Sequence, residues 1–251
     1  MYSNYFYFYP NNLKLGTWYR ATVTVDDSAL AVLDTIANST FRTIPFSLST
    51  LSPANGGVLQ NSADPLSLTF NSAVDKLTVV ASLVVSPGGS NNYTVSSNQM
   101  NISILPFSGA WKAGEDYTLV LNTATLLDIN GSTVEKTDSV YHFSAPQVNV
   151  VDHSPLNNVT DVDTSANVIF TFNTIMDTAS TNPAFSIEDA DGNPFAGGTL
   201  SWNAALTQLT FQPSGTPFSS GTVYTAAIDT SAADTYGVNM QAPFSITFTV
   251  K

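Results

Sequence analysis

The chain has 251 residues, and 19 acidic against 7 basic residues give it a formal net charge of −12. Hydrophobic residues make up 43% of the chain and charged residues 10%, which is too apolar for an intrinsically disordered protein and poor in charge for a cytosolic one. Nucleic acids and anionic membranes attract clustered Lys and Arg, and no run approaches the length of a membrane-spanning helix. We therefore expect neither nucleic acid binding nor membrane insertion.

The chain begins with an alternating aromatic run at residues 5–9, which predicts a strand. A corner that ends at Tyr19 follows, and a second strand-like run occupies residues 20–25. No basic segment precedes an apolar one at the start of the chain, so we expect any export signal to lie outside it.

After this second strand, residues 27–33 carry the best helix signal in the chain, with an Asp as a candidate cap. The segment is short, and we interpret it as a loop turn or a strand, with both alternatives equally open. A polar loop is predicted at residues 34–38 and a closing strand around residues 40–43, where Phe41 alternates with polar neighbours.

The corner at Tyr19 occurs three times in the chain. Each copy has a bulky apolar residue, a Gly three positions later and a Tyr three positions after that: Leu13, Gly16 and Tyr19; Trp111, Gly114 and Tyr117; Phe218, Gly221 and Tyr224. The Gly adopts backbone angles that other residues resist, and the Tyr buries its ring while its hydroxyl bonds the backbone. This layout is that of the tyrosine corner of immunoglobulin-like sandwiches, and its repetition predicts a repeat protein.

Two complete repeats follow the first corner. Two residue pairs share a spacing of 17 positions: Pro53 and Phe70, and Pro155 and Phe172. Five positions after each Phe stands an Asp preceded by an apolar residue: Asp75 and Asp177. Anchors in register over this length indicate a period near 100 residues. We therefore expect a second unit at residues 44–145 and a third unit at residues 146–251, while the first unit, residues 1–43, holds only the second half of a repeat.

The ordered set of Ser-Pro entry, Thr-Phe-Asn strand, apolar-Asp pair, Gly-x-x-Tyr corner and Asp-Gly loop resembles the bacterial Ig-like domain of the S-layer and surface-adhesin type. The resemblance covers the chain as two full copies, preceded by a C-terminal half copy. It implies an all-β fold of tandem immunoglobulin-like β-sandwiches at the surface of, or outside, a bacterial or archaeal cell. It supplies no catalytic residues, and the second unit departs from the pattern at residues 86–90.

A core between two sheets is expected in each complete unit, without disulfides because the chain has no Cys. In the third unit the candidate core residues lie on alternating positions of separate strands: Val168, Phe170, Phe172, Trp202, Leu209, Phe211, Tyr224, Ala226, Phe244 and Phe248.

Catalytic patterns are sparse. His142 falls in a closing strand, and His153 has Asp152 beside it, but neighbours on an extended segment point to opposite faces and form no triad. Asp75 and Asp177 recur at equivalent positions, which favours a role in binding the backbone of a turn over a pair of glycosidase carboxylates. We expect no enzyme.

Calcium is the one cofactor that the residues suggest. Asp189, Asp191 and Asn193 place oxygen ligands in a short loop, as Ca²⁺ prefers, but the Glu that closes an EF-hand loop is missing and an ordinary Asp-Gly turn explains the same residues. Asp161 and Asp163 form a second acidic pair, which we interpret as solvated loop charges. Otherwise no cofactor is expected.

Tandem repetition, low charge and the lack of a catalytic constellation indicate a non-enzymatic structural or spacer module of a surface protein, such as an S-layer, a fibre or an adhesin stalk. The alternative is a carbohydrate-binding or spacer module attached to an extracellular glycoside hydrolase. That alternative requires exposed aromatic rings for polysaccharide stacking, and Trp18 and Trp111 are the candidates because they lie at the corners.

The half unit predicts association with other protein chains. Its aromatic residues include Tyr5, Tyr7, Tyr9 and Trp18, and without first-half strands it leaves an apolar face and open strand edges in water. Three outcomes are compatible: docking on the second unit, pairing with a second copy, or strand complementation by another polypeptide or an upstream segment. We also expect the chain to be a fragment of a longer one.

Overall fold

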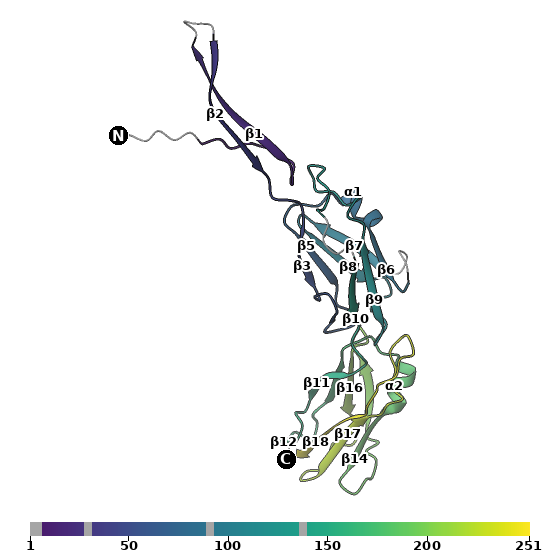
Figure 1. The fold of residues 1–251 in the computed structure, drawn as a ribbon. Helices are drawn as coiled ribbons and strands as arrows, with labels where there is room; N and C mark the ends of the chain where they lie inside the picture. Colours follow the sequence, from purple (N-terminus) through teal and green to yellow (C-terminus); the bar gives the residue numbers. More distant parts are fainter. Residues whose placement is uncertain (1–6, 28–31, 89–92, 136–139) are drawn as a thin grey trace, which may run out of the picture.

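The computed structural model describes residues 7–27, 32–88, 93–135 and 140–251. Two immunoglobulin-like β-sandwiches follow one another along the molecule, with a two-stranded hairpin at the N-terminal end (Figure 1). The all-β fold predicted from the sequence is confirmed.

The second unit is a sandwich of two four-stranded sheets. One sheet has the order β3-β5-β8-β7 and the other the order β4-β10-β9-β6. The strands are β3 (Leu48–Ser52), β4 (Gly57–Val58), β5 (Leu66–Phe70), β6 (Leu83–Ser86), β7 (Tyr93–Asn98), β8 (Asn101–Pro106), β9 (Asp116–Leu121) and β10 (Val140–Ser144). All pairs are antiparallel except β4 with β10, which is parallel.

The third unit repeats this topology strand for strand. Its sheets have the orders β11-β13-β16-β15 and β12-β18-β17-β14, again with one parallel pair, β12 with β18. The strands are β11 (Val150–Ser154), β12 (Val159–Val162), β13 (Val168–Phe172), β14 (Phe185–Asp189), β15 (Gly198–Trp202), β16 (Gln208–Pro213), β17 (Val223–Ile228) and β18 (Phe244–Val250).

Each sandwich buries its own hydrophobic core because apolar residues alternate with polar ones along the central strands. β5 and β13 show the same buried–half-buried alternation over five residues. The ten core residues predicted for the third unit all belong to its core cluster or pack against it, with Trp202 and Phe244 partly buried at its edge. Burial of such apolar surface is the main driving force for folding in a chain without disulfides.

Two short helices connect a strand of one sheet to a strand of the other, and neither was predicted from the sequence. They are α1 (Lys76–Val79), which continues into a 3-10 turn (Val80–Ser82), and α2 (Thr178–Ala184). Asp75 and Asp177 cap them, because each carboxylate accepts a hydrogen bond from the amide two residues later, over 3.0 and 3.1 Å. The two Asp residues therefore have the turn-binding role that their recurrence predicted.

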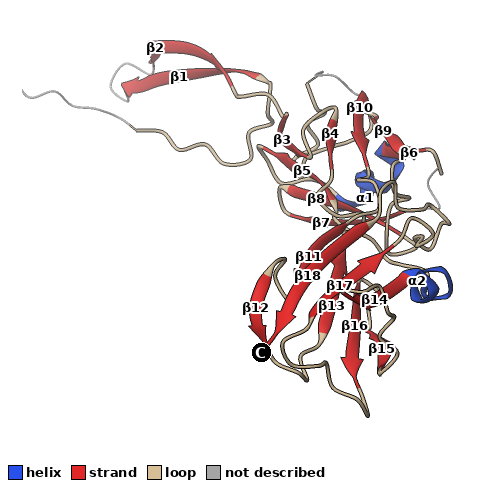
Figure 2. Ribbon diagram, turned by 90° about the horizontal axis from the view of Figure 1, so that it is seen from below, coloured by secondary structure: helices blue, strands red, loops and turns tan. Residues whose placement is uncertain are grey.

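The described part of the first unit is a long antiparallel hairpin of β1 (Trp18–Asp27) and β2 (Val32–Arg42), with a bulge between Val23 and Thr24. Figure 2 shows it standing clear of both sandwiches. Of the segment at residues 27–33, Asp27 ends β1 and the last two residues begin β2, whereas residues 28–31 lie outside the described part.

Two predictions for the first unit are wrong. Residues 34–38 are not a loop but part of β2. In the second and third units the corresponding loop is held by a bridge, Val74 to Asp128 and Met176 to Asp234, and no such bridge forms among the described residues of the first unit. Residues 7–9 form no strand. Among the described residues β1 and β2 pair only with each other, so residues 7–9 have no strand to pair with. Tyr5 lies outside the described residues.

Candidate functional site

The three corners have the same geometry. Each Tyr hydroxyl accepts a hydrogen bond from the amide five residues earlier: Tyr19 from Lys14 over 2.8 Å, Tyr117 from Lys112 over 2.9 Å and Tyr224 from Ser219 over 3.1 Å. Gly16, Gly114 and Gly221 have φ of 67°, 69° and 72°, the left-handed region that a side chain disfavours. Each corner is therefore a preformed rigid turn between two strands.

A five-residue turn with the pattern Asp-x-x-Gly-x, here called the Asp loop, also occurs three times. In each copy the Asp carboxylate accepts from the amides two and four residues later, and the Asp carbonyl accepts from the Gly amide. The copies are residues 128–132, 189–193 and 234–238. Asp128 and Asp234 are buried, whereas Asp189 is half-buried.

The corner of each unit contacts the Asp loop of the next unit. Between the first and second units, the Leu15 amide donates to the Ser132 hydroxyl over 2.9 Å. Between the second and third units, the Ala113 amide donates to the Asp234 carboxylate over 3.4 Å. Leu15 packs against the core of the second unit, and Ala113 belongs to the core cluster of the third. The two junctions are thus built by equivalent positions.

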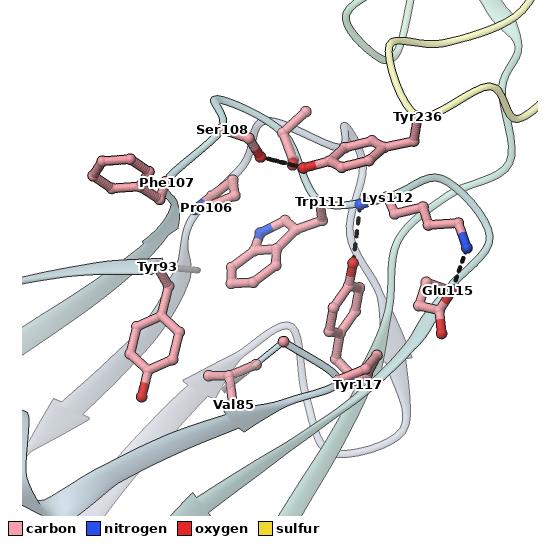
Figure 3. Close-up of a pocket in the computed structure, with 13 residues that line it drawn as sticks. Val85, Tyr93, Pro106, Phe107, Ser108, Trp111, Lys112, Glu115, Tyr117 and Tyr236 are labelled. Atoms are coloured by element: carbon pink, nitrogen blue, oxygen red, sulfur yellow. Dashed lines mark hydrogen bonds and ion pairs between the residues drawn. The ribbon is translucent and has the colours of Figure 1, made fainter. Parts of the chain in front are cut away.

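The second junction has further contacts. The Tyr236 hydroxyl donates to the Ala110 carbonyl over 2.9 Å and also bonds the Ser108 hydroxyl (Figure 3). Beside them, the Ser62 amide donates to the Asn173 carbonyl over 2.8 Å. These hydrogen bonds come from separate loops and cross one boundary between the two sandwiches.

A pocket of about 410 Å³ opens beside this junction. Its aromatic lining consists of Tyr93, Phe107, Trp111, Tyr117 and Tyr236, and Lys112 and Glu115 form an ion pair of 3.1 Å at its edge (Figure 3). Burial raises the pKa of Tyr93 and of Tyr117 above the ordinary value of 10.0, so both hydroxyls stay neutral. The pocket offers flat apolar surfaces with a few polar groups.

The two tryptophans proposed for sugar stacking differ in solvent exposure. Trp18 is 70% exposed, but Trp111 is only 4% exposed, so the expectation of an exposed ring at the second corner is wrong. The Trp111 indole donates to the Asp64 carbonyl over 3.0 Å and packs on Tyr117 and Phe143. Phe107 and Tyr236 are the exposed rings at this place, and the sequence analysis did not single them out.

The hairpin and the segment before it present exposed aromatic residues. Tyr7 and Tyr9 are exposed with Trp18, and Tyr19 stacks on Phe41 with ring centroids 5.8 Å apart. Phe41 is the equivalent of Phe143 and Phe248, because each pairs with a corner Tyr, yet it is 36% exposed and they are 2% and 1% exposed. The face that becomes a core in complete units is thus partly open in the hairpin.

The two histidines lie on different strands, His142 on β10 and His153 on β11. His142 lies exposed on β10 with its ring 3.2 Å from the Thr118 hydroxyl. The His153 ring bonds the Pro155 carbonyl and packs on Phe244, while Asp152 accepts only the His153 backbone amide among the described residues.

The candidate calcium ligands form an Asp loop. One Asp189 oxygen accepts the amides of Asp191 and Asn193, and the Asn193 side chain donates to both oxygens. These bonds, the Asn193 side-chain bond first, lower the pKa of Asp189. No group of three or more metal-binding side chains occurs in the described ranges. Asp161 and Asp163 lie apart from this loop, and Asp163 forms an ion pair with Lys251.

The sequence of the two sandwiches matches the model of a known protein family. The model of the bacterial Ig-like domain matches residues 42–145 and again residues 144–250. The chain belongs to this family. The two matches coincide with the two sandwiches, and the first unit lies outside them apart from its last residues. A search of curated proteins finds no match.

Several solved structures resemble the chain at low similarity. CopC from Methylosinus trichosporium OB3b is 20% identical, over 42% of this chain and 94% of that one, with a TM-score of 0.34. The N-terminal part of the bacterial S-layer protein SbsC is 14% identical over 82% and 44%, with a TM-score of 0.32. An L,D-transpeptidase from Mycobacterium smegmatis is 11% identical over 82% and 87%, with a TM-score of 0.32. Among the helices in the described residues, none has the length and apolar character to cross a membrane.

Proposed function

We propose that the chain is a non-enzymatic structural spacer of a cell-surface or extracellular protein, in which Ig-like units follow one another in a stiff row. The observation that carries this proposal is the repeated junction, where the corner of one unit enters the Asp-loop end of the next. Neighbouring domains in one chain ordinarily move against each other unless their interface is substantial. A junction built twice from equivalent residues favours a mechanical role for the contact.

The contacts at both junctions support the proposal that neighbouring units bend little against each other. At the first, Arg42 forms an ion pair of 2.8 Å with Glu135 and also donates to the Gly16 carbonyl over 2.9 Å. An exposed ion pair contributes only about 0–1 kcal/mol to stability. The hydrogen bond donated by the Leu15 amide and the apolar packing of the Leu15 side chain therefore contribute most to the stability of the first junction. At the second junction the bonds of Tyr236, Ser62 and Ala113 act together.

Small-angle X-ray scattering of the intact chain tests the spacer proposal. A stiff row of units gives an extended particle with a narrow distribution of maximum dimension, unchanged over a range of protein concentration once any association is diluted out. A broad distribution, as expected of units joined by free linkers, would contradict the proposal.

The second candidate function is polysaccharide binding, and the aromatic pocket beside the second junction favours it. Sugar rings stack on flat aromatic faces, and Phe107 and Tyr236 are exposed there with Lys112 and Glu115 as polar neighbours. Titration of polysaccharides with tryptophan fluorescence as the readout separates the two functions, because Trp111 lines this pocket. Saturable binding supports the second candidate function if Phe107→Ala weakens it and Tyr9→Ala leaves it unchanged. If no polysaccharide binds, the structural spacer remains as the proposed function.

We further propose that the hairpin associates with another polypeptide through its strand edges. In the second unit, β9 pairs on its outer side with β6 and β10 with β4, but the equivalent strands β1 and β2 have no outer partners among the described residues. Unpaired edges with an apolar face are a template for another strand. An antiparallel strand fits the edge of β1, and a parallel strand fits that of β2.

Light scattering on the intact chain and on residues 44–251 tests this association. We expect concentration-dependent association of the intact chain only, reduced by Phe41→Ser on the open face and unchanged by Thr40→Ser on the other face. Monomers of equal stability for both chains would contradict the idea.

A further inference from the structure

The three corners share one position, which contacts the next unit in the first two corners. It lies between the residue whose amide bonds the Tyr hydroxyl and the Gly with positive φ. Leu15, Ala113 and Ser220 occupy it in the first, second and third corners.

In the first two corners this position enters the next unit in two ways. Its amide donates into the Asp loop of that unit, from Leu15 to Ser132 and from Ala113 to Asp234. Its side chain packs against or within the hydrophobic core cluster of that unit. The residue thus closes the end of a sandwich that belongs to the following unit.

The third corner is preformed but uncovered. Tyr224 accepts the Ser219 amide over 3.1 Å, the Gly221 amide donates to the Val250 carbonyl over 3.0 Å, and Phe218 is buried beneath. Ser220 itself is exposed, and its amide makes no hydrogen bond to the described residues. A rigid turn with an exposed donor at the junction position needs no rearrangement to bind, which lowers the cost of association.

We infer that the corner at Ser220 is a docking surface for the Asp-loop end of a further Ig-like unit. This rests on the proposed spacer function and names the partner of its C-terminal end. The partner supplies an acceptor, a carboxylate as in Asp234 or a hydroxyl as in Ser132, for the Ser220 amide. Ser220 has a small side chain like that of Ala113, so it fits the same kind of site at the Asp-loop end of a following unit. A second intact copy is not the partner. Its loops at residues 128–132 and 234–238 already contact its own corners. Its third Asp loop, residues 189–193, lies in the turn between β14 and β15, which is not the position that a corner contacts at either junction.

Extension of the intact chain tests this inference. Val250 is equivalent to Ala145, since each carbonyl accepts the amide of the corner Gly. A copy of residues 146–251 is therefore joined directly after Val250, and amide hydrogen exchange of Ser220 is followed by NMR in the original and the extended chain. The intrinsic exchange rate of the residue is the same in both. We expect exchange of the Ser220 amide to slow by about ten-fold or more in the extended chain, the factor that one net hydrogen bond provides.

Matched variants and a second extension complete the test. In the extended chain, Ser220→Asp is expected to restore fast exchange at residue 220 by placing a like charge beside the Asp loop, whereas Ser214→Asp, on an exposed residue outside the junction position, leaves Ser220 protected. A second extension carries residues 45–145 after Val250 and offers Ser132 as acceptor. Unchanged exchange of Ser220 behind a folded added unit overturns the inference, and so does a failure of both added units to fold. Neither result affects the scattering test of the spacer, which uses the original chain.

Discussion

The hydroxyl of Tyr236 in the third unit donates a hydrogen bond to the carbonyl of Ala110 in the second, over 2.9 Å. Tyr236 lies in the Asp loop at residues 234–238, and Ala110 lies just before the corner that ends at Tyr117. The same hydroxyl also bonds Ser108. One side chain therefore connects the two preformed turns of the junction.

Replacing this hydroxyl tests how far the junction limits bending. Tyr236→Phe keeps the ring in place but removes both bonds, and we expect it to lower the free energy of unfolding by about 0.5–1.5 kcal/mol. It also broadens the distribution of particle dimensions in X-ray scattering. Tyr9→Phe is the control, because Tyr9 is exposed and makes no hydrogen bond to the described residues. Equal scattering of the two variants and the original chain would show that Tyr236 does not limit bending.

Gly114 and Gly221 separate the backbone strain of a corner from contact with the next unit. Both have positive φ, so alanine strains either corner by about 1–2 kcal/mol. A Cβ at Gly114 also overlaps the Gln147 side chain of the third unit, whereas a Cβ at Gly221 meets nothing within 4 Å. We expect Gly114→Ala to lower the free energy of unfolding more than Gly221→Ala and to loosen the second junction. Denaturant unfolding compares the stabilities, and equal losses would mean that Gln147 moves aside freely.

The parts of the fold that depend on local chemistry could be predicted from the sequence. The corner needs a Gly and a Tyr at fixed spacing, and the alternation of Val168, Phe170 and Phe172 identifies a core strand. The recurrence of Asp75 and Asp177 indicated a backbone role, although the short helices that they cap have too few residues for a helical period.

Features that depend on contacts between distant segments could not be predicted. The loop expected at residues 34–38 is part of β2, and the bridges that shape the equivalent loops, Val74 to Asp128 and Met176 to Asp234, have no counterpart among the described residues of the first unit. Trp111 is buried because it packs on Tyr117 and Phe143 in the core of the second unit, where the backbone carbonyl of Asp64, far along the chain, accepts its indole N–H. The junction position was missed as well, although the constant spacing between corner Gly and corner Tyr marks it once its role is known.

Calcium addition tests the Asp loop at residues 189–193. Asp189 already accepts amide hydrogens from Asp191 and Asn193, and the same turn forms at Asp128 and Asp234. A metal that bound the native state would raise the melting temperature by mass action. We expect equal melting temperatures in excess chelator and in millimolar Ca²⁺. A clear rise with Ca²⁺ that Asp189→Asn abolishes would contradict this and assign a metal site.

Acid should destabilise the third unit through three carboxylates, of which Asp163 and Asp229 are exposed and Asp189 is half-buried. Hydrogen bonds from Ser165, and then the ion pair with Lys251, hold the pKa of Asp163 well below its ordinary value of 3.8. Bonds from Asn193 lower the pKa of Asp189, and bonds from Ser231 lower that of Asp229.

A carboxylate whose pKa is lower in the folded than in the unfolded state stabilises the fold above the unfolded pKa. It loses that contribution as the pH falls toward the folded pKa, because the unfolded state then takes up more protons. We therefore expect the free energy of unfolding to be level above about pH 5 and to decline below the ordinary Asp pKa. Asp163→Asn should lower the stability at neutral pH and flatten this decline. Asp191→Asn is the matched control, because the Asp191 carboxylate accepts no hydrogen bond from the described residues. Urea unfolding at a series of pH values measures both slopes, and identical slopes for the two variants would show that the bonds of Asp163 do not contribute to acid sensitivity.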